Sequence, residues 1–372
     1  MAAIFTHAMD ILRALETAQL PYYLAGYSAL DRYFRQQHGD NVYVVIRGSL
    51  VDLARALGEL SYPGLELWDA THLNGEGAVY FRCQEEGDAE VKHSFSVLDF
   101  LYDPDADKFL DRSEAYAQLR CETLTPDGPL HHSLRIITEA AVLVSRYNYS
   151  ADASHLPALQ APQELPAEFQ RKLLIDILSG IRSDRGLRLL FESGFVSRYW
   201  PELAPMNDAE HSKEYHPEGN VWEHSLETFR YRKTQDLLLS LGLLLHDSGK
   251  PDAERNKKNA FSGHTELGAR TGRRFLRRLG FSEGFAEDVA WLIRNHMFPG
   301  ALHKLPVYRT RKLMLSPLFP LLLELYRCDL SSTYRGPDGY YRACKTYRAF
   351  LRNNNNPFRG ADGKKMVQLY VE

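Results

Sequence analysis

Apolar and polar residues follow two different patterns along the chain, and the change between them falls near residue 120. Before it, period-2 segments predict strands over Tyr22 to Ala25, Val42 to Ile46, Val79 to Cys83 and Phe95 to Leu101. Helical spacing in the same part predicts helices over Met9 to Ala18 and Leu50 to Leu60. This mixture predicts a small α/β domain over residues 1–120.

From Leu130 onward the strand signals fade and apolar residues recur at helical spacing. Helices are predicted over Leu134 to Val144, Phe169 to Leu178, Leu187 to Phe191, Leu237 to Leu245 and Leu318 to Leu325. Stretches rich in Pro and polar residues interrupt the pattern at 150–166 and 201–219. We therefore expect an α+β chain: a head over 1–120, a mostly helical neck over 121–205, an all-α domain over 206–352, and a loose tail over 353–372.

Composition narrows the class of protein. The chain has 372 residues, 25% charged and 44% hydrophobic, with a net charge of −3. These values are ordinary for a globular chain and exclude wholesale disorder and a globally basic nucleic-acid coat. Four dispersed cysteines without a CxxC pair predict a reducing cytoplasmic setting. No apolar run approaches the ~20 residues of a membrane span, so no membrane association is expected.

The segment LLSLGLLLHDSGK draws attention to His246 and Asp247. The helix before them is apolar on every face, which predicts deep burial, and Gly249 is suited to the left-handed position that ends a helix. A buried, unpaired carboxylate costs several kcal/mol, so Asp247 needs a cation nearby. Two explanations remain open from this segment alone: a salt bridge to Lys250, or a metal ion.

Three further helices bear on that choice. The apolar spacing of FAEDVAWLIRNHM turns His296 inward, and that of FPLLLELYRCD turns Asp329 inward. In VWEHSLETF, His224 lies about 200° around the helix from Trp222, which predicts that it points into a cleft or into solvent. Two buried carboxylates and several histidines on separate helices favour a divalent cation, because imidazole and carboxylate are its common ligands.

This order of residues resembles the H…HD…D signature of HD-superfamily metal-dependent phosphohydrolases. The resemblance implies that one ion is held by His224, His246, Asp247 and Asp329, and that Asp247 bridges to a second ion held by His264 and His296. Asp247 and Lys250 would then be the catalytic residues, Lys250 by contacting a phosphate oxygen. The implied cofactors are two divalent ions, with Mn, Fe, Ni, Co, Zn and Mg all open.

Upstream, the chain resembles bacterial tRNA nucleotidyltransferases of the poly(A) polymerase type, in PELAPMNDAEHSKEYHPEGNVWEHS, YYLAGYSALDRYF and FSVLDFLYD. Those enzymes need a GG turn for the triphosphate and a DxD pair for magnesium. Here Tyr27 replaces the second glycine, and Asp40-Asn41-Val42 replaces the acidic pair. Valine cannot coordinate magnesium, so we expect a degenerate nucleotidyltransferase-like head in which Asp31 and Asp40 are solvated.

One helix face could contact a nucleotide or RNA. Its five cations are Arg270, Arg273, Arg274, Arg277 and Arg278, at i, i+3, i+4, i+7 and i+8. The alternative is a solvated face paired with acids elsewhere. The leading hypothesis is an HD phosphohydrolase acting on a phosphomonoester or phosphodiester of a nucleotide or RNA end. The alternatives are an active tRNA nucleotidyltransferase of the CCA-adding type, or a non-catalytic RNA-binding protein with a structural metal site.

Overall fold

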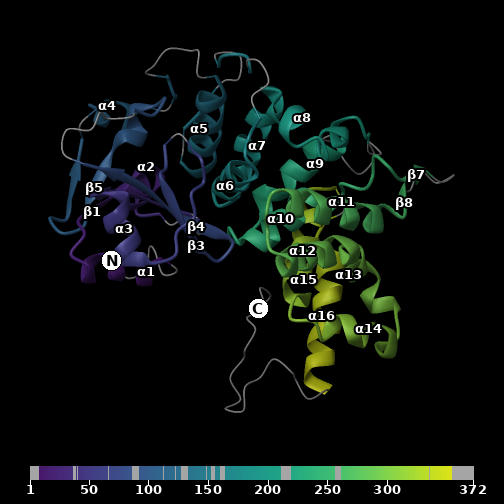
Figure 1. Ribbon diagram of the computed structural model, residues 1–372. Helices are drawn as coiled ribbons and strands as arrows, with labels where there is room; N and C mark the ends of the chain where they lie inside the picture. The colour runs from purple at the N-terminus through teal and green to yellow at the C-terminus, as the bar shows by residue number, and fades with distance from the viewer. Residues whose placement is uncertain are drawn as a thin grey trace. The chain divides into compact units, whose positions relative to one another are not determined.

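The computed structural model describes residues 8–353 except 37–38, 40, 66, 86–91, 112, 122, 127–132, 148, 152–155, 160–163, 211–218, 256–260 and 335. The chain divides into two compact units, Met1–Phe195 and Val196–Glu372, which Figure 1 shows in purple to teal and in teal to yellow. The finer boundaries between head, neck and HD domain stay predictions. Asp40 and almost all of the expected tail lie outside the described residues.

The first unit is built on a six-stranded sheet in the order β3-β4-β2-β1-β5-β6. The strands are β1 (Tyr22–Ala25), β2 (Val42–Arg47), β3 (Ala70–Asn74), β4 (Gly77–Gln84), β5 (Leu101–Asp103) and β6 (Lys108–Leu110). Strands β2 and β4 pair in parallel, and the other neighbours are antiparallel. Sequence alternation located β1, β2 and β4, but the strand expected over 95–101 is a 3-10 turn, η1 (Ser96–Asp99), followed by β5.

Helices cover this sheet and extend beyond it (Figure 1). They are α1 (Met9–Thr17), α2 (Gly26–Phe34), α3 (Leu50–Leu57), α4 (Tyr116–Leu119), α5 (Ser133–Arg146), α6 (Ala167–Leu178) and α7 (Ser183–Glu192). Alternate β2 residues Val42, Val44 and Ile46 join one apolar core with α1 and α3. Since side chains alternate along a strand, Tyr43 is directed to the opposite face.

The second unit is helical apart from one two-stranded ribbon, β7 (Glu254–Arg255) with β8 (Phe261–Ser262). Its helices are α8 (Phe195–Tyr199, at the boundary), α9 (Val221–Thr228), α10 (Leu237–Leu245), α11 (His264–Arg278), α12 (Glu283–Asn295), α13 (Phe298–Ala301), α14 (Val307–Met314), α15 (Phe319–Ser331) and α16 (Asp338–Asn353). Three 3-10 turns are interspersed: η3 (Ala204–Asn207), η4 (Phe229–Tyr231) and η5 (Leu302–Lys304). The α+β class expected from the sequence is confirmed.

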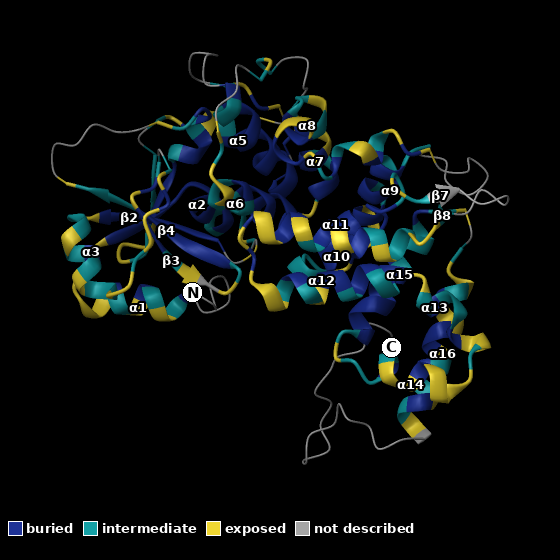
Figure 2. Cartoon of the chain, turned by 45° about the vertical axis from the view of Figure 1, so that its right-hand side comes forward, coloured by how far each residue is buried: buried dark blue, intermediate teal, exposed yellow. Residues whose placement is uncertain are grey.

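Helix α10 lies at the centre of this unit, as its buried colour in Figure 2 shows. A Cβ at Gly242 would come within 2.9 Å of Leu325 on α15 and 3.3 Å of Leu292 on α12, so the missing side chain lets three helices approach closely. None of the described helices has the length and apolar character needed to cross a membrane.

Candidate metal centre

Four histidines and two aspartates from five helical segments meet inside the second unit. His224 comes from α9, whose start is fixed by the Asn220 side chain accepting from the backbone N–H of Glu223 at 2.8 Å. His246 and His296 directly follow α10 and α12, and His264 opens α11. Asp247 follows His246, and Asp329 lies in the last turn of α15. All six residues that the sequence singled out as metal ligands are therefore neighbours.

Three of the histidines are fixed in the same way. The Nδ1 atoms of His246, His264 and His296 each lie 2.8 Å from the carbonyl oxygen three residues earlier, which belongs to Leu243, Phe261 and Ile293. A carbonyl can only accept, so each neutral ring carries its proton on Nδ1 and presents a lone pair on Nε2. This is the tautomer and the supporting contact that metal-binding histidines use.

The Nε2 lone pairs of these three histidines point toward one another, and no proton lies between them in this tautomer. His264 Nε2 and His296 Nε2 lie 3.5 Å apart, although both are acceptors in the tautomer that the carbonyls select. His246 Nε2 is buried and has no hydrogen-bond partner among the described residues. The ring centroids of His224, His246, His296 and His264 follow one another at 5.3 Å steps. Two facing lone pairs repel, and a cation between them removes that repulsion, so the donor set fits a metal ion.

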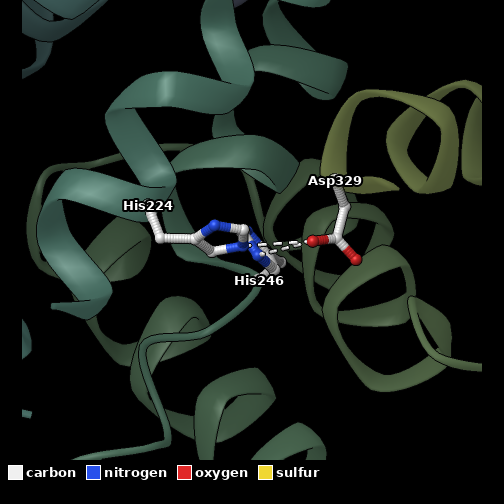
Figure 3. A group of neighbouring side chains, drawn as sticks. All are labelled: His224, His246 and Asp329. Atoms are coloured by element: carbon white, nitrogen blue, oxygen red, sulfur yellow. Dashed lines mark hydrogen bonds and ion pairs between the residues drawn. The ribbon is translucent and has the colours of Figure 1, made fainter. Parts of the chain in front are cut away.

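The ligand atoms fall into two groups of three. His224, His246 and Asp329 form one, drawn in Figure 3, and Asp247, His264 and His296 form the other. In the first, Asp329 Oδ1 lies 3.1 Å from His224 Nε2 and 4.0 Å from His246 Nε2.

Asp247 faces both groups. Its Oδ2 lies 3.3 Å from His246 Nε2 and 3.8 Å from His224 Nε2, and its Oδ1 lies 3.7 Å from the Nε2 atoms of both His264 and His296. One carboxylate with an oxygen toward each group is the arrangement that a bridging ligand requires. The bridging role itself stays a prediction.

Burial and charge act against each other on the two carboxylates. Burial by itself would raise the pKa of Asp247, but the Lys250 ammonium and His246 outweigh it and hold that pKa well below its usual range. For Asp329, the hydrogen bond from His224 and the electrostatic interaction with His246 likewise overcome burial and lower the pKa. Both groups are therefore carboxylates at neutral pH, the form that binds metal.

The histidines shift in the complementary direction. Burial lowers the pKa of His296 to about 4 and also lowers that of His264, although Asp247 opposes the change in each. Neutral imidazole is the form that ligates a metal, so neutral pH leaves these two rings ready to bind.

Two local expectations from the sequence need correction. Of the two orientations left open for His224, into a cleft or into solvent, the solvent one is wrong: the residue is buried inside the cluster, because α9 is covered on nearly every face. Gly249 does not adopt a left-handed conformation. It is needed because a Cβ there would lie 2.1 Å from the carbonyl oxygen of His264 and 2.3 Å from the amide of Gly268, where α11 packs against the turn.

Lys250 also lies against this centre: its Nζ donates to Asp247 Oδ2. Both explanations left open by the sequence are therefore present together, a lysine salt bridge and a set of metal-ligating atoms around one carboxylate. The salt bridge alone leaves the lone pairs of His264 and His296 facing each other.

The head presents a different interior where nucleotidyltransferases keep their acidic pair. Val42 opens β2 and is 2% exposed, in the apolar core. Asn41 is also buried, and its Nδ2 donates to Asp176 Oδ1 at 2.9 Å. Tyr27 is buried against Tyr43, with ring centroids 5.5 Å apart. The described residues thus place an aromatic ring, Tyr27, and an apolar side chain, Val42, at positions that the resemblance reserves for the second glycine and the second carboxylate.

A buried ion network occupies this interior. Arg146 Nη2 donates to Asp176 Oδ1 at 2.6 Å and its Nε to the Asp176 carbonyl at 2.9 Å. Lys172 Nζ and the Tyr43 hydroxyl donate to the other oxygen of Asp176. Asp31 accepts from the Tyr147 hydroxyl at 2.6 Å and is 2% exposed, so the expectation that it is solvated is wrong.

The arginine face on α11 exists, but acids neutralise much of it. Arg273 pairs with Glu287 at 2.7 Å, Arg277 with Glu283 at 3.0 Å, and Arg278 with Glu202 at 2.8 Å. Arg270 and Arg274 are exposed and form no ion pair among the described residues. That the arginine face of α11 binds RNA stays a prediction.

Comparison with known proteins agrees with both halves of this description. Residues 220–321 match the HD domain family. A CC-adding tRNA nucleotidyltransferase of Thermus thermophilus is 35% identical over 178 residues, 44% of this chain and 41% of that protein. An A-adding tRNA nucleotidyltransferase of Deinococcus radiodurans is 30% identical over 166 residues, 41% of this chain and 36% of that protein. The chain thus spans less than half the length of these relatives.

The fold agrees as well. The crystal structure of the Bacillus stearothermophilus CCA-adding enzyme in complex with CTP matches with a TM-score of 0.53 and 13% identity, over 94% of this chain and 83% of that one. At this identity the match shows the fold alone, a nucleotidyltransferase-like head followed by helical domains. The chain therefore contains an HD domain and resembles tRNA nucleotidyltransferases, as the sequence motifs indicated.

The comparisons correct the predicted activity. These relatives carry the names of nucleotidyltransferases, which are transferases, so the expectation of an HD phosphohydrolase is wrong. An HD motif specifies a set of ligands, and the reaction depends on the protein around them. The hydrolase hypothesis came from the resemblance to the HD superfamily. The helical spacing of the residues predicted only a metal site.

Proposed function

We propose that this chain is an RNA-directed protein of the tRNA nucleotidyltransferase type, which binds tRNA or an RNA with a similar end and holds divalent metal in its HD domain. The proposal is supported by the relatives that act on tRNA and by the shared fold. The observation that carries the metal part is the convergence of Nε2 lone pairs and carboxylates in the two groups around Asp247.

The residues of the centre would divide the work. Two divalent ions, with identity open among Mn, Fe, Ni, Co, Zn and Mg, would supply the positive charge that the facing lone pairs and the two carboxylates lack. The carbonyls behind His246, His264 and His296 hold those rings in the ligating tautomer. Lys250 occupies Asp247 Oδ2 and neutralises it when metal is absent.

The head would contribute RNA binding without nucleotide addition. The Arg146–Asp176 network fills its interior, and Val42 offers no oxygen to magnesium. A second candidate, active nucleotidyl transfer, is favoured by the names of the relatives. It requires a nucleotide site built differently from the one that the resemblance implies.

One experiment separates the two candidates. The full chain is titrated with a tRNA transcript lacking its 3′ end, and the same mixture is then supplied with labelled CTP and ATP. We expect binding without incorporation. Label entering the transcript, and lost in Asp40→Ala, would establish the transferase; absence of RNA binding at low salt would reject both candidates.

A further inference from the structure

The last part of the second unit has an uneven charge distribution. Residues 297–315 and 339–353 contain no aspartate or glutamate. Their cations are Lys304, Arg309, Arg311, Lys312, Arg342, Lys345, Arg348 and Arg352. In a chain whose net charge is −3, two acid-free stretches carrying eight cations are a local concentration of positive charge.

The two stretches come together in space. Helix α13 and turn η5 both pack against α16, and α14 begins three residues after η5. Figures 1 and 2 both show α14 beside α16. We call the exposed cations of η5, α14 and α16 the α14–α16 surface.

Most of these cations form no ion pair with the residues that the structure describes. Lys304, Arg309, Arg311 and Lys312 are exposed and form no ion pair with any described residue. The same holds for Arg342, whose Nε donates only to the Asp338 carbonyl oxygen, and for Lys345 and Arg352.

Exposed rings accompany the charges. Tyr308 is 76% exposed beside Arg309, Tyr334 is 72% exposed just before α16, and Tyr341 on α16 is 60% exposed. Met297 and Val307 are exposed in the same region. Proteins bind single-stranded RNA with cations that contact the phosphates and with aromatic rings on which bases stack. The exposed side chains of this region offer both.

Helix α11 provides the internal comparison. It carries five arginines, but three of them, Arg273, Arg277 and Arg278, are engaged by Glu287, Glu283 and Glu202. A paired arginine must give up its acid before it can take a phosphate. No described acid competes in this way for the exposed cations of the α14–α16 surface named above.

We infer that RNA docks on the α14–α16 surface, with its phosphates on the η5, α14 and α16 cations and an unpaired base on Tyr308, rather than on the arginines of α11. This inference rests on the proposed RNA-directed function and names the surface that performs it. The partner is a phosphate backbone with at least one unstacked base.

The test compares two triple variants of the full chain in RNA binding. Arg309→Gln/Arg311→Gln/Lys312→Gln removes three exposed α14 cations, and Arg273→Gln/Arg277→Gln/Arg278→Gln removes the three acid-paired arginines of α11 as the control. Affinity for a tRNA transcript is measured by fluorescence anisotropy between 50 and 200 mM salt. We expect the α14 triple to bind about tenfold more weakly and its log–log salt slope to fall by roughly 2, at about 0.7–0.9 per phosphate contact. The α11 triple should stay within about threefold of wild type.

Tyr308→Ala gives a second readout, since its side chain is too exposed to affect folding. It should weaken binding of a transcript with an unpaired 3′ end, leave a fully duplex RNA unaffected, and keep the salt slope.

Other outcomes reject the inference in distinguishable ways. Suppose that the wild-type protein binds RNA and that both triple variants lower the affinity equally, or that only the α11 triple lowers it. The α14–α16 surface is then not the docking site, while the proposed function stands. If wild type binds no RNA, the proposed function fails with it. If wild type binds phosphatidylserine vesicles and the α14 triple abolishes that binding alone, the surface serves a membrane instead.

Discussion

Each unit buries a cluster of charged side chains, and the two clusters are neutralised in different ways. In the first unit, Asp176 receives the guanidinium of Arg146, the ammonium of Lys172 and two neutral donors, so the protein supplies its own cations. In the second, Asp247 and Asp329 are surrounded mainly by imidazole rings, and three of these rings present a lone pair at Nε2. Burial of carboxylates alone therefore does not distinguish a structural network from a ligand site.

The donors around each carboxylate make that distinction. Lysine and arginine can only donate, so they complete the Asp176 network and leave no place for an ion. A histidine with its Nδ1 proton on a carbonyl can only accept at Nε2, so in the second cluster the Lys250 ammonium reaches Asp247 while the facing Nε2 atoms of His264 and His296 stay without a proton between them. The donors therefore identify the Asp176 cluster as a self-neutralised network and favour a metal ion at the second cluster.

The largest expected effect comes from breaking the first cluster. Asp176→Ala leaves Arg146 buried without its carboxylate, and losing one partner of a buried pair costs about 3–5 kcal/mol. Hydrogen exchange followed by mass spectrometry should show the loss of protection in residues 8–195. Glu227→Ala, which removes an exposed partner of Arg230, is the control and should cost under about 1 kcal/mol. Equal effects would mean that the Asp176 network is not a buried structural pair.

Metal should stabilise only the second unit. An ion present at 100 times its dissociation constant adds about 2.7 kcal/mol to the state that binds it. We expect Mn²⁺ to raise, and EDTA to lower, the melting temperature of the transition assigned to residues 196–353. Asp247→Ala should remove this response and Asp176→Ala should keep it. A metal response that survives Asp247→Ala would contradict the assignment.

Acid should separate the units in the metal-free protein. The pKa of His296 is lowered from 6.5 to about 4 by burial, so the unfolded chain takes up its proton first as the pH falls. The second unit therefore loses stability between about pH 6.5 and 4. The pKa of Asp176 is lowered from 3.8, because Lys172 and Arg146 outweigh burial, so its contribution is lost only below about pH 4. Calorimetry in EDTA at pH 7 and 5 should show the second unit shifting down more; the reverse order would contradict this account.

The smallest effect is expected at Lys250. Its ammonium competes with metal for Asp247 Oδ2, so Lys250→Met should keep its metal and bind it up to about tenfold more tightly, the equivalent of one hydrogen bond to a charged group. Lys304→Met, on the exposed η5 turn, is the matched control. Loss of metal in Lys250→Met would make the lysine a structural part of the centre.

Sequence periodicity predicted the helices and strands whose apolar residues follow a clear pattern. The apolar run of α10 and the inward spacing of His296 and Asp329 located most of the metal centre. The sequence left His224 open between a cleft and solvent, because α9 is buried on almost every side and its apolar stripe does not mark a solvent face.

The Asp176 network was not predictable from the sequence. Asn41, Arg146 and Asp176 are at least thirty residues apart in the sequence, and no local pattern links them. The carbonyls that orient the histidines leave a weak signal: His246 and His296 both stand immediately after a helix, where a ring can reach the carbonyl three residues back.

Anomalous diffraction from crystals of the full chain grown with Mn²⁺ tests the central contrast most directly. The account predicts Mn²⁺ density against the His224, His246 and Asp329 group and against the Asp247, His264 and His296 group, and none beside Asp176. Absence of density at both histidine groups, or density at Asp176, would contradict it.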